Sequence, residues 1–240
     1  MKPLTHFFHC FHPLVKLEKQ RVKLLRSGQC PAQLLPLFEQ SYIKMNENPT
    51  ALSYLAIDFE TTGLNSMMDN ILSIAAVPID NLTLRLSESW HQFVAEKEVK
   101  RDTAVINHIV PQMLYDASSL DEVMNKLFSL MRGRIIIAHG STIEKRFIQH
   151  YLATRYGLTS FPLLWLDTLR IERSLMHEKQ HNINPNYQLA AVRQSYRLPE
   201  YIMHNALIDA IAAGELFLAQ LTRLFGRQKK TLGVIYKRSM

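Results

Sequence analysis

The sequence has few cysteines and no long hydrophobic run. Cys10 and Cys30 are the only cysteines among its 240 residues, and one pair in a cytosolic chain is typical of reduced thiols rather than of a disulfide framework. No stretch of about 18 uncharged apolar residues occurs, which argues against a transmembrane helix. The N-terminal apolar run is short and is interrupted by His6, His9 and His12, unlike that of a secretory signal. These absences predict a cytoplasmic protein.

The segment HFFHCFH, residues 6–12, gathers histidines and a cysteine close to the N-terminus. These side chains can bind soft metals, but their spacing matches no usual zinc pattern and aromatic residues dominate the segment. We therefore interpret it as an apolar docking or packing segment, with a metal site as the weaker alternative.

Positive charge is concentrated at the two ends of the chain. The formal net charge is +7, and residues 1–50 carry seven Lys or Arg against three acids, while residues 223–240 carry six and no acid. A mildly acidic centre between basic ends is typical of a site that collects cations and of flanks that attract a polyanion such as nucleic acid. The alternative is that the basic ends only maintain solubility, and charge alone favours neither interpretation.

Hydrophobic spacing divides the chain into three parts. Residues 1–50 combine a helical apolar spacing with Gly and Pro breakers, which predicts a helical, basic N-terminal extension. Residues 51–225 are expected to form the main domain, and residues 226–240 a basic C-terminal tail.

The main domain begins with expected strands and continues with alternating helices and strands. SYLAIDFE, DNILSIAAVPID and TLRLSESWHQFVA predict three strands, and their short connections favour an antiparallel meander. The elements expected after the meander are a helix in SSLDEVMNKLFSLMRG, a strand at 134–139, a helix at 141–156, a strand at 162–168 and helices at 168–177, 187–195 and 205–225. This order predicts an α/β fold with a mixed sheet flanked by helices.

Two carboxylates interrupt the first expected strand. Asp58 and Glu60 are separated by one residue, so they project from the same face. Because neighbouring like charges are costly, a bound cation is the usual relief, and Mg²⁺ and Mn²⁺ prefer carboxylate oxygens. The spacing alone is a weak signal, since a strand end with its acids in solvent has the same pattern.

The last long helix is expected to begin beside another acid. In HNALIDAIAAGELF, Asn205 suits the N-cap position and places Asp209 in the first turns as a third carboxylate. His204 lies just outside the helix, where its near-neutral pKa suits removal of a proton from water. Taken alone, this spacing occurs by chance in many proteins.

Four segments, AIDFETTGLN, HGSTIEKRFI, WLDTLRI and HNALIDAIAAGELF, together resemble the motifs of the DEDDh branch of the DEDD exonuclease superfamily. That branch includes the proofreading epsilon subunit of bacterial DNA polymerase III, ribonuclease T and oligoribonuclease. The resemblance covers residue 52 to about residue 225, roughly three quarters of the chain. It implies a ribonuclease H-like fold and a 3′–5′ exonuclease that releases 5′ mononucleotides, with DNA favoured and RNA as the alternative substrate.

The resemblance also implies the residues of a catalytic centre. Asp58, Glu60, Glu144 and Asp209 would bind two divalent ions, Mg²⁺ or Mn²⁺, which straddle the last phosphodiester at the 3′ end. His204 would be the general base that activates the attacking water.

Further positions follow from the same resemblance. Thr61, Thr62 and Leu64 would bind the terminal nucleotide, through backbone amides and an apolar side chain. Asp167 would have a structural role below the site. His108 matches a family position and equally suits a packed histidine at a helix end.

Glu144 departs from the family, which normally has Asp at this position. The extra methylene moves the carboxylate by about an ångström, a displacement to which catalysis is sensitive. Glu144 also follows Ser141 by three residues, the spacing of a helix capping box, so a purely structural role is the alternative. If Glu144 only caps the helix, the chain would be a catalytically weak module that binds nucleic acid or a protein partner. The basic ends would bind backbone phosphate, and the N-terminal extension is the expected contact for a protein partner.

Overall fold

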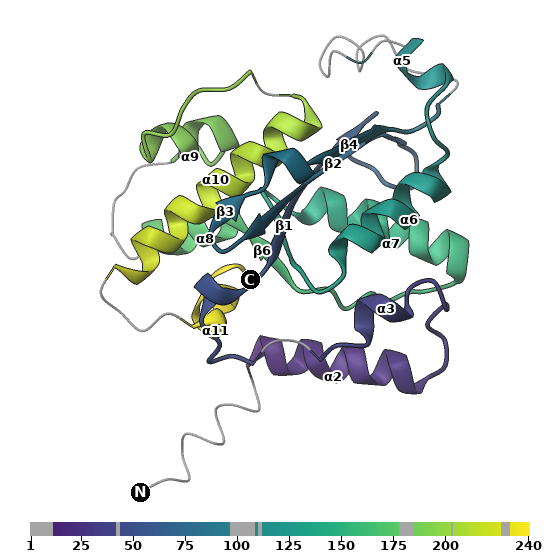
Figure 1. The fold of residues 1–240 in the computed structure, drawn as a ribbon, viewed down its shortest axis with the longest axis horizontal. Helices are drawn as coiled ribbons and strands as arrows, with labels where there is room; N and C mark the ends of the chain where they lie inside the picture. The colour runs from purple at the N-terminus through teal and green to yellow at the C-terminus, as the bar shows by residue number, and fades with distance from the viewer. Residues whose placement is uncertain are drawn as a thin grey trace, which may run out of the picture.

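A central mixed sheet with helices on both faces forms the framework of the protein (Figure 1). The computed structural model describes residues 12–41, 44–96, 109, 112–177, 185–202, 204–226 and 231–240. His108 and residues 6–11 of the histidine and cysteine cluster lie outside the described residues. Within the described ranges, no helix is both long enough and apolar enough to cross a membrane.

The sheet combines antiparallel and parallel pairs. Its strands are β1 (Tyr54–Thr61), β2 (Ile71–Asp80), β3 (Thr83–Leu84), β4 (Trp90–Phe93), β5 (Ile135–Ala138) and β6 (Trp165–Asp167). Their order is β3-β2-β1-β5-β6, with β4 also paired to β2. β1 is antiparallel to β2 and parallel to β5, which is parallel to β6. The expected α/β fold with a mixed sheet is therefore confirmed.

The third expected strand is divided in two. β3 and β4 both pair with β2, and the short 3₁₀ helix η2 (Leu86–Glu88) separates them. Leu86 is 55% exposed, so this part of the segment has no apolar face to bury against the domain. The polar run around it favours a turn over a continued strand.

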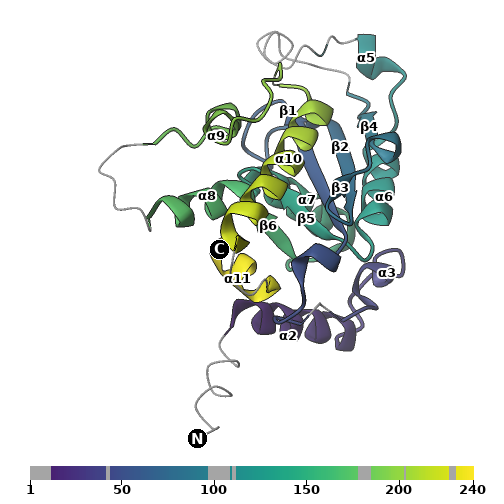
Figure 2. The same cartoon turned by 60° about the vertical axis from the view of Figure 1, so that its left-hand side comes forward.

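Helices cover the two faces of the sheet in separate layers (Figure 2). The α-helices of the described residues are α2 (Pro13–Arg26), α3 (Leu35–Phe38), α5 (Gln112–Tyr115), α6 (Leu120–Met131), α7 (Thr142–Tyr156), α8 (Thr168–His177), α9 (Leu189–Ser195), α10 (Ala206–Phe225) and α11 (Leu232–Arg238), and η1 (Pro49–Ala51) is a short 3₁₀ helix before β1. Leu55 and Ile57 of β1 belong to the core formed with α6 and α7, whereas Tyr54 and Ala56 belong to the core formed with α10. The alternation along β1 thus directs Asp58 and Glu60 toward the α10 face.

Close packing of α10 on the sheet depends on Gly214. A Cβ atom at this position would lie 3.2 Å from both Ile79 Cδ1 and Leu84 Cδ2, and 3.4 Å from Ala56 Cβ. The absence of a side chain lets α10 approach β1 and β2 directly. This approach brings the first turn of α10, with Asp209, to the carboxyl end of β1.

The segment expected as a basic C-terminal tail contains helix α11. Leu232 and Ile235 are fully buried, and α11 contacts α2 of the N-terminal extension. The Leu232 N–H donates to Glu47 O at 3.0 Å, and the Gly233 N–H donates to Met45 O at 2.8 Å. The basic residues on either side of LGVIY favoured a tail, but LGVIY forms a short helix whose apolar side chains are buried against the rest of the chain. The described part of the extension thus packs on its own chain, and a protein partner for it stays a prediction.

Candidate active site

Three expected acids meet where β1 ends and α10 begins. Asp58, Glu60 and Asp209 each offer a carboxylate oxygen, and these oxygens all lie within 4.8 Å of one another. β1 presents the first two from one face, and its pairing with β2 shifts register directly after Glu60. Asp209 comes from the first turn of α10, which Asn205 caps by accepting from the N–H groups of Leu207 and Ile208.

Burial and mutual repulsion raise the pKa of each acid in this group. Burial first, and then the charges of Glu144, Asp209 and Glu60, raise the pKa of Asp58 well above its usual range. Burial and Asp209 raise the pKa of Glu60 to about 7. Burial also raises the pKa of Asp209, against the opposing effect of the N–H of His204. Such a cluster takes up protons near neutral pH unless a cation compensates its charge.

Glu144 is buried beside the three acids. It lies in the first turn of α7, directly after β5, and β5 is the parallel neighbour of β1. Its side chain is only 4% exposed, and Oε2 is buried with no hydrogen-bond partner among the described residues. Burial is the main cause that raises the pKa of Glu144 to about 8, and the charge of Asp167 adds to it. Glu144 in turn raises the pKa of Asp58, so its charge adds to that of the three clustered acids.

The capping box considered for Glu144 is absent. Ser141 is the N-cap residue of α7, but its side chain makes no capping hydrogen bond. Its N–H and its Oγ each donate to Asp167 Oδ2 at 2.9 Å, and the Gly140 N–H donates to Asp167 Oδ1 at 3.0 Å. Asp167 therefore links the end of β5 to the end of β6. It also accepts the hydrogen bond of the Ser141 hydroxyl, which a capping box would require. Glu144 therefore does not take part in a capping box with Ser141, the structural role considered as the alternative for it.

His204 lies at the exposed entrance to α10. Its backbone has a φ of 68°, in the left-handed region, and its N–H donates to Asp209 Oδ2 at 2.9 Å. This bond connects the loop before α10 to one of the clustered acids. The other Asp209 oxygen, Oδ1, is buried and has no hydrogen-bond partner among the described residues.

The loop after β1 folds around Asp69. The Thr62 hydroxyl donates to Asp69 Oδ1 at 3.2 Å, and the Asn65 N–H donates to Asp69 Oδ2 at 2.9 Å. A Cβ atom at Gly63 would lie 2.5 Å from Asp69 Oδ2, so a side chain there would displace the Asp69 carboxylate. Leu64 is consequently held outward and is 68% exposed, while the Thr61 hydroxyl donates to Gly63 O at 2.7 Å. Asp69 was not predicted from the sequence, in which its signal is an acid in the short loop between β1 and β2.

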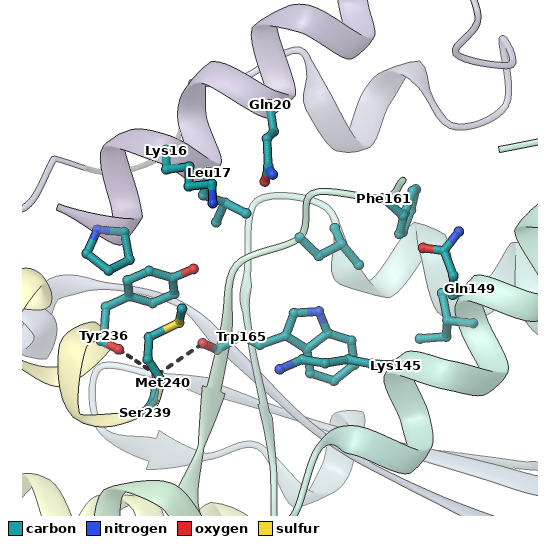
Figure 3. Close-up of a pocket in the computed structure, with 13 residues that line it drawn as sticks. Lys16, Leu17, Gln20, Lys145, Gln149, Phe161, Trp165, Tyr236, Ser239 and Met240 are labelled. Carbon is teal, nitrogen blue, oxygen red and sulfur yellow. Dashed lines mark hydrogen bonds between the residues drawn. The ribbon is translucent and has the colours of Figure 1, made fainter. Parts of the chain in front are cut away.

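A separate cavity of about 410 Å³ lies between α2, α7, β6 and α11 (Figure 3). The Lys145 ammonium lies 5.2 Å from the centre of the Trp165 ring, and Tyr236 of α11 lines another part of the cavity. None of the four clustered acids lines it. This cavity was not predictable from the sequence, because its walls come from α2, α11 and the main domain, which are far apart along the chain.

Solved structures with the same fold include nucleases. Cell-death related nuclease 4 matches with a TM-score of 0.62 and 16% identity, covering 72% of this chain and 64% of that chain. E. coli exonuclease I in complex with a dT13 oligonucleotide matches with a TM-score of 0.59 and 17% identity, covering 73% and 43%. Exonuclease X in complex with 5′ overhanging duplex DNA matches with a TM-score of 0.55 and 19% identity, covering 76% and 99%. These likenesses confirm the ribonuclease H-like fold.

Related sequences match the same part of the chain. The PolC-type DNA polymerase III of Thermotoga petrophila is 29% identical over 179 residues, which cover 74% of this chain and 12% of that protein. The corresponding protein of Staphylococcus aureus is 27% identical over 186 residues, 76% of this chain and again 12% of the relative. This chain thus spans a small fraction of the length of these relatives. A family profile described as Exonuclease matches residues 55–217. With more than half of its length inside that match, the chain belongs to the exonuclease family, as the resemblance of its motifs implied.

Proposed function

We propose that the protein is a metal-dependent 3′–5′ exonuclease that releases 5′ mononucleotides from nucleic-acid ends, with DNA as the favoured substrate. The observation that carries this proposal is the cluster of Asp58, Glu60 and Asp209, with Glu144 buried beside it, in an exonuclease fold. The DNA oligonucleotides bound by two structural neighbours support DNA as the substrate.

The donor set suits hard divalent cations. All four side chains offer carboxylate oxygen, and buried oxygens of Asp209 and Glu144 have no hydrogen-bond partner among the described residues. Their raised pKa values indicate a centre short of positive charge, and Mg²⁺ and Mn²⁺ prefer such oxygen ligands. Two of these ions, when bound, would supply Lewis-acid stabilisation of the charge that develops at the phosphodiester.

The remaining residues have roles in positioning and proton transfer. His204 removes the proton from the attacking water, and the bond from its N–H to Asp209 ties the loop that carries it to the acidic centre. Thr61 ends β1 and Thr62 begins the loop that presents Leu64 to solvent, where Leu64 can contact the terminal sugar and base.

The polarity and substrate are tested with oligonucleotides labelled at either end. Single-stranded and duplex DNA and RNA are incubated with and without Mg²⁺ or Mn²⁺, and the products are resolved by length. We expect a 3′ label to be released first as a mononucleotide and a 5′ label to give a ladder that shortens stepwise. Comparison of DNA with RNA is necessary because no side chain of the site reports on the 2′-hydroxyl.

The site assignment is tested by removing one carboxylate. We expect Asp58→Ala to abolish the metal-dependent activity. Asp116→Ala is the matched control, because Asp116 is an exposed acid outside the cluster. Unchanged hydrolysis by the Asp58→Ala variant would show that the acidic cluster is not the active site.

A further inference from the structure

A second groove, of about 690 Å³, lies between the start of α7, α8 and α11. Four cationic side chains line it, Arg170 and Arg173 from α8 and Lys237 and Arg238 from α11. α8 and α11 contact each other directly, although some 60 residues separate them in the sequence (Figure 2). The fold therefore gathers cations from two helices at one place on the surface.

The groove presents this positive charge to solvent. Arg170, Arg173 and Lys237 are exposed. Asp167 is the acidic side chain among the described lining residues, but it is only 1% exposed. Its oxygens accept hydrogen bonds from N–H groups at the start of α7 and from the Leu169 N–H, and Arg170 Nε lies 3.8 Å from Asp167 Oδ2. Arg173, Lys237 and Arg238 add further positive charge to the groove. Solvent thus meets mainly cations, which an anionic ligand would complement.

The groove begins beside the candidate active site. Thr142 and Ile143, in the first turn of α7, line the groove, and Glu144 follows them directly. Asp167 lies at the base of the groove and accepts hydrogen bonds from the N–H groups of Gly140 and Ser141, directly before α7. The groove and the acidic centre thus adjoin the same end of α7.

Beyond the groove the basic surface continues. Met240 lines both this groove and the cavity in Figure 3. Lys145 of α7 and Lys16 of α2 line that cavity from opposite sides (Figure 3). A long anionic chain would therefore meet further cations after it leaves the groove.

We propose that the α8–α11 groove binds the phosphodiester backbone of the nucleic-acid strand whose end occupies the active site. This inference rests on the proposed function, which supplies the strand. The groove offers charged guanidinium and ammonium groups, so the contact is independent of sequence and weakens with salt. An acidic protein would also be attracted by the charge, but a nucleic-acid strand accounts for the position of the groove next to the acidic centre.

The test is binding of single-stranded DNA without hydrolysis. Fluorescence anisotropy in EDTA measures the affinity of a labelled strand of about 20 nucleotides, longer than a typical single-strand binding site. The full chain is compared with the Arg173→Gln/Lys237→Gln variant over a range of salt concentrations. Lys126→Gln/Arg132→Gln is the matched control, because Lys126 of α6 and Arg132 directly after it are exposed cations. Neither residue lines the groove, and α6 packs in a different core from α8 and α11. Circular dichroism establishes that each variant is folded.

We expect the groove variant to bind about tenfold more weakly, and the slope of log affinity against log salt to fall by about 1.4, since each lost phosphate contact removes about 0.7 for single strands. The control variant should bind like the unmodified chain. Equal affinities for all three proteins, or an equal loss of affinity in both variants, would refute the proposal that the groove binds the strand. Hydrolysis is measured separately. If the unmodified chain does not hydrolyse oligonucleotides with Mg²⁺ or Mn²⁺, the proposed function is refuted, whatever the binding data show. The single variants Arg173→Gln and Lys237→Gln decide the question if the double variant does not fold.

Discussion

Glu144 should destabilise the protein at neutral and alkaline pH when no divalent ion is present. Its carboxylate is buried next to Asp58 and has an oxygen without a hydrogen-bond partner among the described residues. In the unfolded chain the same group is solvated and ionises normally. Folding without a cation therefore requires Glu144 either to bury a charge or to keep a proton.

The magnitude follows from the pKa of Glu144, which burial raises from 4.5 to about 8. Because the folded-state pKa lies above the unfolded one, the contribution of Glu144 to stability is fully present below pH 4.5 and is lost as the pH rises through 8. At pH 7 the linkage relation gives a loss of about 3 kcal/mol, since each pKa unit corresponds to about 1.4 kcal/mol. Glu144→Gln removes the charge but preserves the shape, so it should recover an amount of this order.

The assay is thermal unfolding in EDTA as a function of pH. For a chain of this size, about 3 kcal/mol at pH 7 corresponds to a rise of roughly 6–12 °C in the unfolding midpoint, and the rise should be larger at pH 8. We expect the Glu144→Gln variant to unfold at a higher temperature than the unmodified chain at pH 8 and at a similar temperature at pH 4.5. Saturating Mg²⁺ or Mn²⁺ should stabilise the unmodified chain more than the variant, which has lost one ligand, and so narrow the difference.

Glu122 supplies a control of opposite sign. This exposed acid accepts hydrogen bonds from the N–H and hydroxyl of Ser119, which lower its pKa. Its contribution to stability is present above its unfolded pKa and is lost as the pH falls, so Glu122→Gln should not stabilise the protein at pH 8. If Glu144→Gln unfolded at or below the temperature of the unmodified chain at pH 8, or if their difference did not change with pH, the burial of an uncompensated charge would be refuted.

Three further substitutions test the site and its support. Glu144→Asp should lower the metal-dependent kcat by about tenfold to a hundredfold, because the shorter side chain withdraws its oxygens from Asp58 by about an ångström; higher activity would mean that the longer side chain is a handicap. His204→Ala should lower kcat by a factor of about 10²–10⁴ and flatten the dependence of kcat on pH. An equal decrease of kcat at every pH would mean that another group transfers the proton. Gly214→Val should destabilise the fold by about 1–3 kcal/mol in denaturant unfolding, since its side chain would press on Ile79 and Leu84, and an unchanged midpoint would mean that α10 can move away without cost.

Strong periodicity explains which parts of the fold were predictable. β1, α6 and α10 bury one face or stripe against a large core, so their spacing identifies them. α11 was missed because its stability depends on contact with α2 and the main domain, a property that no local pattern carries. The interruption between β3 and β4 likewise depends on where the edge of β2 is available for pairing.

Some residues of the site are placed by local sequence patterns and others by long-range contacts. Period two alone puts Asp58 and Glu60 on one face, and the cap at Asn205 puts Asp209 at the start of α10. The role of Glu144 depends instead on whether the Ser141 hydroxyl binds the helix end or a distant acid. A capping box would have held Glu144 at the helix end, as it holds Glu122 in α6. Asp167, 26 residues along the chain from Ser141, takes both the N–H and the hydroxyl of Ser141. Because that competition is decided by the pairing of β5 with β6, only the folded chain assigns Glu144 to the acidic centre rather than to a cap.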